Sequence, residues 1–229
     1  HSVTKPSREE LINKAFKFHS QGNIKEAEKY YRYFIEQGFK DHRIFSNLGN
    51  ILKDLGNLKE AEISYRKAIE LNPEFAYPHL NLGGLLTDRG QLEKGEQSMK
   101  RANQIQPNLI KNYLNLGMNY QLQDQIEKSI NSYNNVLMLT ESTSGEALQA
   151  RVHLAVNNLI TGNFKEVEKH IFKFTELINE GVLEKIKSKI NKRHISARSN
   201  YLKHLYPLLK STRNLKFPKL ILHIGESHC

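Results

Sequence analysis

The hydrophobic positions of this chain follow a helical spacing that repeats in a longer frame. Between residues 42 and 55, Phe45, Leu48 and Leu52 fall on one side of a helix with about 3.6 residues per turn. The same pattern returns after a shift of 34 residues. The small residues that mark this shift are Gly49, Gly83 and Gly117. The chain therefore repeats a unit of 34 residues.

This frame predicts an array of helical hairpins. It gives four adjoining repeats at residues 8–41, 42–75, 76–109 and 110–143, and a fifth at 148–181 after the insertion ESTS. Position 15 of four repeats is a glycine, which ends the first helix, and a proline closes the second helix of two of them, at Pro73 and Pro107. We predict an all-α array of five hairpins over residues 8–181, built on a small residue at position 8 of every repeat.

The segment NLGNILKDLGNLKEAEISYRKAIELNP, at residues 47–73, resembles the tetratricopeptide repeat. It has small residues at positions 8, 20 and 27, an aromatic residue at position 24 and a proline at position 32. The likeness is weaker in the third repeat, where Gly95 and Met99 depart from the pattern, and in the last two repeats. The resemblance implies a right-handed superhelical solenoid in which the first helices line the concave side.

One polar residue recurs where helix packing does not require it. Position 6 lies roughly opposite position 8 on a helix with about 100° per residue, so it points away from the packed side. Asparagine is only a moderate helix former, and its carboxamide matches the N–H and C=O of a peptide main chain. We expect these residues to contact an extended peptide, as the resemblance to the asparagine ladder of the O-linked N-acetylglucosamine transferase repeats also implies. They are Asn13, Asn47, Asn81 and Asn115, with His153 in the fifth repeat.

A second interpretation of the asparagines stays open, because each side chain could instead bond a neighbouring helix or water. We call positions 2, 6, 9 and 13 of the first helices the asparagine face. In the second to fourth repeats this face adds candidate contacts that would give selectivity, namely Arg43, Asn50, Tyr77 and Lys111. In the last two repeats it turns apolar, so we expect a ligand or the chain's own C-terminal segment to cover it. Its apolar residues are Met118, Leu122, Val156 and Ile160.

A known pattern of the family, the carboxylate clamp for chaperone tails, is incomplete here. The best frame supplies Asn50, Asn81 and Lys111, but it has Ser46 and Asn115 where cations belong. We therefore do not expect this chain to bind chaperone tails.

The charge of the chain is concentrated near its end. The net charge is +10, and residues 182–220 hold eleven lysines and arginines against one acid. Apolar residues at helical spacing in this segment predict a basic amphipathic capping region over residues 182–214. Clustered cations also suit nucleic acid or an acidic membrane, but no aromatic residue is interleaved with the cations of residues 185–198, and a nucleic-acid partner is not expected.

Residues 215–229 change character. The run LILHIG reads as a buried strand, and with the following ESH it is similar to the first block of SGNH or GDSL-type hydrolases. The resemblance would make Ser227 a nucleophile, although Glu226 replaces the usual aspartate. A serine without its base is inert, so we expect no hydrolysis by this piece. The tail is either frayed or the start of a following domain.

The composition of the chain argues against several classes of protein. No run is long and apolar enough for a membrane helix, and the single cysteine, Cys229, suits a reducing compartment such as the cytoplasm. The histidines lack zinc-ligand spacing, and no phosphate loop or acid and base pair stands in the repeats, so we expect no metal, no cofactor and no enzyme activity. The sequence gives no indication of the oligomeric state.

We conclude that the sequence predicts a scaffold that binds a protein or peptide through the asparagine face. The alternative is the substrate-selecting arm of a larger enzyme, such as an SGNH-type hydrolase, whose catalytic domain is missing here.

Overall fold

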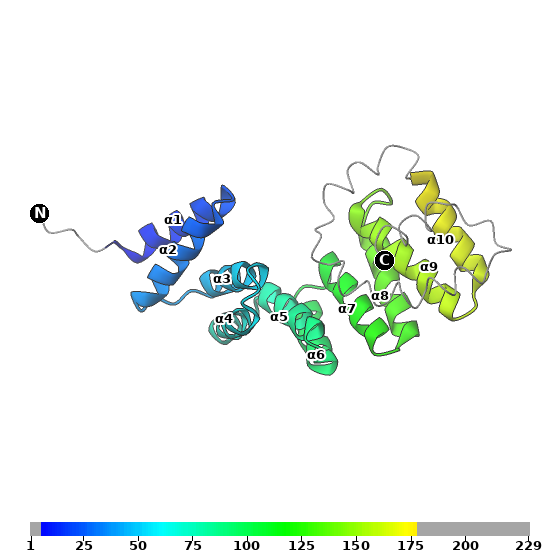
Figure 1. The fold of residues 1–229 in the computed structure, drawn as a ribbon, viewed down its shortest axis with the longest axis horizontal. Coiled ribbons are helices and arrows are strands. Elements are labelled where there is room, and N and C mark those ends of the chain that lie inside the picture. The colour runs from blue at the N-terminus through cyan, green and yellow to red at the C-terminus, as the bar shows by residue number, and fades with distance from the viewer. Residues whose placement is uncertain (1–5, 178–229) are drawn as a thin grey trace, which may run out of the picture. The chain divides into compact units, whose positions relative to one another are not determined.

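The computed structural model of this chain describes residues 6–177, and in that part every regular element is a helix. Figure 1 shows the two helices of a hairpin lying side by side: α1 pairs with α2, α3 with α4, α5 with α6, and α9 with α10. The prediction of an all-α array of hairpins is confirmed. The helices are α1 (Arg8–Ser20), α2 (Ile24–Glu36), α3 (His42–Asp54), α4 (Leu58–Leu71), α5 (Ala76–Asp88), α6 (Leu92–Ile105), α7 (Ile110–Leu122), α8 (Ile126–Leu139), α9 (Gly145–Ile160) and α10 (Phe164–Leu177).

The chain forms two compact units, residues 1–115 and residues 116–229. In the first unit, one continuous core joins α1 to α5, and its largest fully buried side chains include Tyr31, Phe34, Tyr65 and Leu85. A smaller core joins α5, α6 and the residue that precedes α7. The predicted capping region at 182–214 and the strand-like tail at 215–229 lie outside the described residues.

The contact that sets each hairpin is the close approach of its two helices at position 8. A Cβ atom added to Gly49 would lie 2.6 Å from the ring of Tyr65, and one added to Gly117 would lie 2.6 Å from the ring of Tyr133. Both distances are shorter than a normal non-bonded carbon–carbon contact, so a side chain at either glycine would force the tyrosine ring to move. Gly83 packs against Met99 in the same way. In these three repeats the side chain at position 24 therefore lies against the backbone of the first helix.

The turn between paired helices uses the left-handed backbone conformation at position 15. Gly56 there has φ +84°, and Gly22, Gly90 and Gly162 are similar. Glycine enters this region without the steric penalty of a Cβ atom. The fourth repeat has Asp124 at the same position, with φ 58°, and it is the one non-glycine residue with positive φ in the described part of the chain.

The insertion before the fifth repeat works as a helix cap. The hydroxyl Oγ of Ser144 accepts a hydrogen bond of 3.0 Å from the backbone N–H of Ala147. Such a side chain satisfies one of the free N–H groups at a helix N-terminus. Helix α9 consequently begins at Gly145, three residues ahead of the repeat boundary at 148 that the sequence frame predicts.

The strained turn at Asp124 leads to a first prediction. The substitution Asp124→Gly should raise the free energy of unfolding by roughly 0.5–1 kcal/mol, because it removes the left-handed penalty of a side chain. Chemical denaturation followed by circular dichroism measures the change. The matched control is Gly56→Ala, which introduces that penalty and should lower stability by about 1 kcal/mol. A loss of stability in Asp124→Gly would mean that the aspartate side chain itself holds the turn.

Candidate functional site

The position-6 asparagines lie on the first helices α1, α3, α5 and α7, each beside a buried packing residue. Asn13 is exposed, whereas Asn47, Asn81 and Asn115 are half-buried. Leu48, which follows Asn47, is buried, so the carboxamides sit at the boundary between the core and the solvent. Their surroundings differ from one repeat to the next.

Asn47 is tied to the preceding repeat. Its amide Nδ2 donates to the Tyr31 hydroxyl at 3.3 Å, and that hydroxyl lies 2.7 Å from Nδ1 of His19. Because the Tyr31 oxygen accepts from Asn47, its own proton is free to go to His19, which then acts as the acceptor. Burial raises the pKa of Tyr31 to about 12, with the hydrogen bond from Asn47 acting in the opposite direction, so the hydroxyl stays protonated.

Asn81 is also tied to the preceding repeat, through a second asparagine. Its Nδ2 donates to Oδ1 of Asn50 at 2.8 Å, and the Tyr65 hydroxyl donates to the same oxygen at 2.9 Å. Burial raises the pKa of Tyr65, with the nearby charge of Asp54 adding to the effect, so this hydroxyl is also a firm donor. Asn50 therefore joins three helices. Within the described part of the chain, the Oδ1 atoms of Asn47 and Asn81 accept no hydrogen bond.

Asn115 has a different environment. Its Nδ2 lies 3.3 Å from the place that a Cβ atom on Gly84 would occupy, and Nζ of Lys53 lies 3.9 Å from the same point. The Asn115 carboxamide makes no hydrogen bond to any residue that the structure describes. Gly84, which is half-buried, thus has an amide group and an ammonium group beside the place where a side chain would begin.

Two lysines lie in this region. Lys53 Nζ is 3.6 Å from Oδ2 of Asp88. The side chain of Lys111 is exposed, yet the protein around its ammonium group is dense enough for partial burial to lower its pKa; the charge of Lys53 adds to the effect and that of Asp54 opposes it. Sequence reasoning selected Lys111 and missed Lys53. Lys53 is at position 12, between the packed side and the asparagine face. Its position around the helix therefore did not indicate that it lies near the asparagines.

Arg43 and Tyr77, which the sequence also indicated as candidate contacts, differ in how many contacts they make within the protein. Arg43 forms a two-point contact with Asp41, at 3.0 Å from Nε and 2.8 Å from a terminal nitrogen, and its guanidinium lies 5.3 Å from the centre of the Phe16 ring. Tyr77 is 47% exposed, with its ring 5.7 Å from that of Phe75. Arg43 is therefore held by residues of the preceding repeat, while Tyr77 is exposed.

In the second compact unit the position-6 residue is His153, and its role is packing. Its ring stacks on Tyr133 at 4.7 Å between centroids with 7° between the planes. Below it, Gln121 donates to Asn157 at 2.6 Å, Asn157 donates to Ser129 at 2.9 Å, and all of these residues except His153 are buried. The predicted apolar face is open in places, since Leu122 is 52% exposed and Ile160 is 47% exposed.

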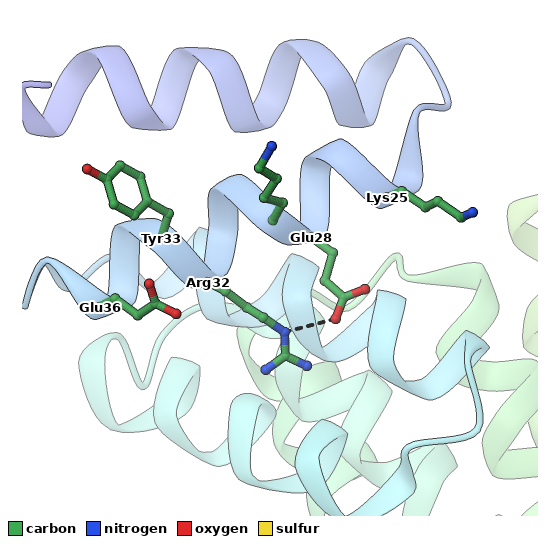
Figure 2. A pocket seen from close by; sticks show the side chains of 6 residues that line it. Lys25, Glu28, Arg32, Tyr33 and Glu36 are labelled. Atoms are coloured by element: carbon green, nitrogen blue, oxygen red, sulfur yellow. Dashed lines mark hydrogen bonds and ion pairs between the residues drawn. The ribbon is translucent and has the colours of Figure 1, made fainter.

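A shallow pocket lies elsewhere, on α2. Figure 2 shows that charged side chains line it and that Arg32 contacts Glu28, at 2.9 Å. Arg32 also donates to Glu60 on α4 at 3.1 Å. These charges satisfy one another and brace neighbouring helices, so the pocket adds no candidate site. Its lining consists of Lys25, Glu28, Lys29, Arg32, Tyr33 and Glu36.

Two further searches concern metal ions and membranes. Within residues 6–177, no three histidine, cysteine, aspartate or glutamate side chains gather in a way that could hold a metal ion. None of the helices in that range is long and apolar enough to cross a membrane.

Comparison with known proteins now adds to the geometry. The tetratricopeptide repeat family matches residues 42–75 and again residues 110–143. These ranges coincide with the second and fourth repeats of the 34-residue frame. The two matched segments are tetratricopeptide repeats. No curated protein matches the sequence.

Solved structures of tetratricopeptide repeat proteins resemble the fold. MamA from Desulfovibrio magneticus has a TM-score of 0.67 at 20% identity, over 78% of this chain and 98% of that one. A tetratricopeptide repeat protein from Parabacteroides merdae has a TM-score of 0.64 at 20% identity, over 87% of this chain and 79% of that one. A thermophilic one from Thermus thermophilus has a TM-score of 0.57 at 16% identity, over 80% and 98%. At these identities the likeness concerns the fold.

The shared oxygen of Asn50 gives a second prediction. Asn50→Ala removes the acceptor of both Tyr65 and Asn81, so it should lower the free energy of unfolding by about 1–2 kcal/mol. Thermal unfolding measures this change. The control is Asn13→Ala, an exposed asparagine on the same face, which should leave stability unchanged. Equal unfolding midpoints for the two variants would mean that the hydrogen bonds at Asn50 contribute nothing.

Proposed function

We propose that this chain is a protein-interaction scaffold that binds an extended peptide segment along the asparagine face. The observation that carries the proposal is the recurrence of a carboxamide at position 6 in four successive repeats, at the boundary between core and solvent. Bonds to the preceding repeat use the amide nitrogens of Asn47 and Asn81, but they do not account for the asparagines at Asn13 and Asn115, which make no such bond to a described residue. The family of the chain is compatible with a binding role.

The orientation of the carboxamides defines what the face offers. Asn47 and Asn81 use their amide nitrogens internally, which fixes the side chains and leaves each Oδ1 atom as an acceptor. An acceptor in a fixed position matches a main-chain N–H of a peptide laid alongside. Main-chain recognition gives affinity with little dependence on peptide sequence. Selectivity would then come from side chains beside the asparagines, where Tyr77 and Lys111 are exposed.

The proposed role is binding without chemistry, by a scaffold that works in the cytoplasm. The alternative, in which the repeats select substrates for a larger enzyme, rests on the sequence run that ends in Ser227, which lies outside the described residues. Both functions use the same face for a peptide. They differ in whether a longer native chain contains the base and the oxyanion donors that a serine nucleophile needs.

The test uses a defined peptide probe. Peptides of twelve residues are selected against the full chain from a random phage-displayed library, and their affinity is measured by fluorescence anisotropy. In the best binder, single main-chain N–H groups are then replaced by ester oxygens. At least two replacements should weaken binding about fivefold, the effect of one lost net hydrogen bond.

A variant arm localises the binding. The combined variant Asn13→Ala, Asn47→Ala, Asn81→Ala and Asn115→Ala should lose most of the affinity, measured at a temperature where circular dichroism shows it folded. The matched control is Asn134→Ala, an exposed asparagine on the second helix α8. The proposal fails if the combined variant binds the selected peptide as well as the control does, or if no ester replacement changes the affinity.

A further inference from the structure

Two internal partners hold the asparagines in the middle of the first unit. One is the tyrosine at position 24 of the preceding repeat, sixteen residues earlier: Tyr31 bonds Asn47 directly. The other is an asparagine at position 9 of the preceding repeat, thirty-one residues earlier: Asn50 bonds Asn81 and links it to Tyr65. Each of these asparagines therefore belongs to the internal hydrogen-bond network of the repeats.

Both partners are missing in front of Asn115. The residue sixteen positions earlier is Met99, which has no hydroxyl, and the residue thirty-one positions earlier is Gly84, which has no side chain. The geometry is consistent with the loss of a partner at residue 84, because Asn115 Nδ2 lies 3.3 Å from the position that a Cβ atom of this residue would occupy. A carboxamide at residue 84 would begin within reach of Asn115, and the chain has glycine there instead.

This difference determines which asparagine gives a bound ligand the largest gain in binding free energy. Asn115 is half-buried and, among the described residues, has no partner for either its donor or its acceptor. A polar group that is partly removed from water and left without a partner is costly, so a ligand that supplies both partners gains more than at an exposed site. Asn13 also has no hydrogen-bond partner among the described residues, but it is exposed to solvent. Asn47 and Asn81 offer only their oxygens.

We propose that Asn115 is the anchoring contact of the asparagine face, and that its carboxamide takes both the N–H and the C=O of one peptide residue seated over Gly84. The inference rests on the proposed peptide-binding function. The missing side chain of Gly84 lets a second backbone approach closely. Lys53 borders this subsite, and Lys111 lies one helical turn before Asn115 on the same face.

The decisive variant restores the missing tyrosine. Met99→Tyr can be accommodated because Gly83 faces residue 99 as Gly49 faces Tyr65 and Gly117 faces Tyr133. Its hydroxyl would stand toward Asn115 as that of Tyr31 stands toward Asn47, and it would compete with the ligand. Met99→Phe is the matched control, since it adds the same ring without the hydroxyl.

The probe is the dodecapeptide selected on the wild-type chain. Met99→Tyr should bind it about fivefold more weakly than Met99→Phe does, and should unfold at a higher temperature than Met99→Phe. Equal affinities for the two folded variants would overturn the inference. Should the tyrosine variant fail to fold, Asn115→Ala decides: it should weaken binding about fivefold relative to Asn134→Ala, with the melting temperature unchanged.

The two proposals fail in different ways. If the combined asparagine variant keeps full affinity, peptide binding by this face is wrong. If the combined variant loses affinity while Asn115→Ala keeps it, the face binds peptide but Asn115 is not its anchor.

Discussion

In the second, third and fourth repeats a side chain of the second helix lies against a glycine of the first helix, and the polar pattern of the asparagine face depends on this contact. Where the side chain is a tyrosine, the absence of a Cβ at Gly49 or Gly117 lets the ring pass over the helix. The tyrosine hydroxyl then donates a hydrogen bond to a side chain of the first helix, Asn50 in the second repeat and Gln121 in the fourth. The packing of the hairpin thus delivers a fixed donor to the face where the asparagines stand.

One consequence is that the carboxamides for which we propose a binding role contribute to stability to different degrees. Asn47 and Asn81 hold adjacent repeats together through their amide nitrogens. In an array whose stability is approximately a sum of repeats and nearest-neighbour interfaces, such bonds set the register of one repeat on the next. In the third repeat Met99 fills the same space against Gly83 without a hydroxyl. The packing of the hairpin is therefore the same there, but no tyrosine hydroxyl is present to bond Asn115.

The sequence predicted the fold well because packing imposes short periods that can be counted. The helical spacing and the small residue at position 8 define the hairpins, and both follow from one repeat alone. The hydrogen-bond partners of the asparagines were not predictable in the same way. The bonds from Asn47 and Asn81 join residues sixteen and thirty-one positions apart, and whether a tyrosine hydroxyl reaches the asparagine directly depends on ring position. The location of Lys53 beside Gly84 and the stacking of His153 on Tyr133 were not predictable for the same reason, because each contact depends on how a neighbouring helix packs. The interpretation that the asparagines bond neighbouring helices is confirmed for Asn47 and Asn81, and their contact with a peptide stays a prediction.

The most direct measurement is nuclear magnetic resonance of the asparagine side-chain NH₂ groups in the ¹⁵N-labelled chain, titrated with the selected dodecapeptide. The account predicts that the Asn115 signals shift most on binding, while those of Asn47 and Asn81, whose nitrogens are already bonded, move little. Equal shifts at the four position-6 asparagines, or no shift at Asn115, would contradict it.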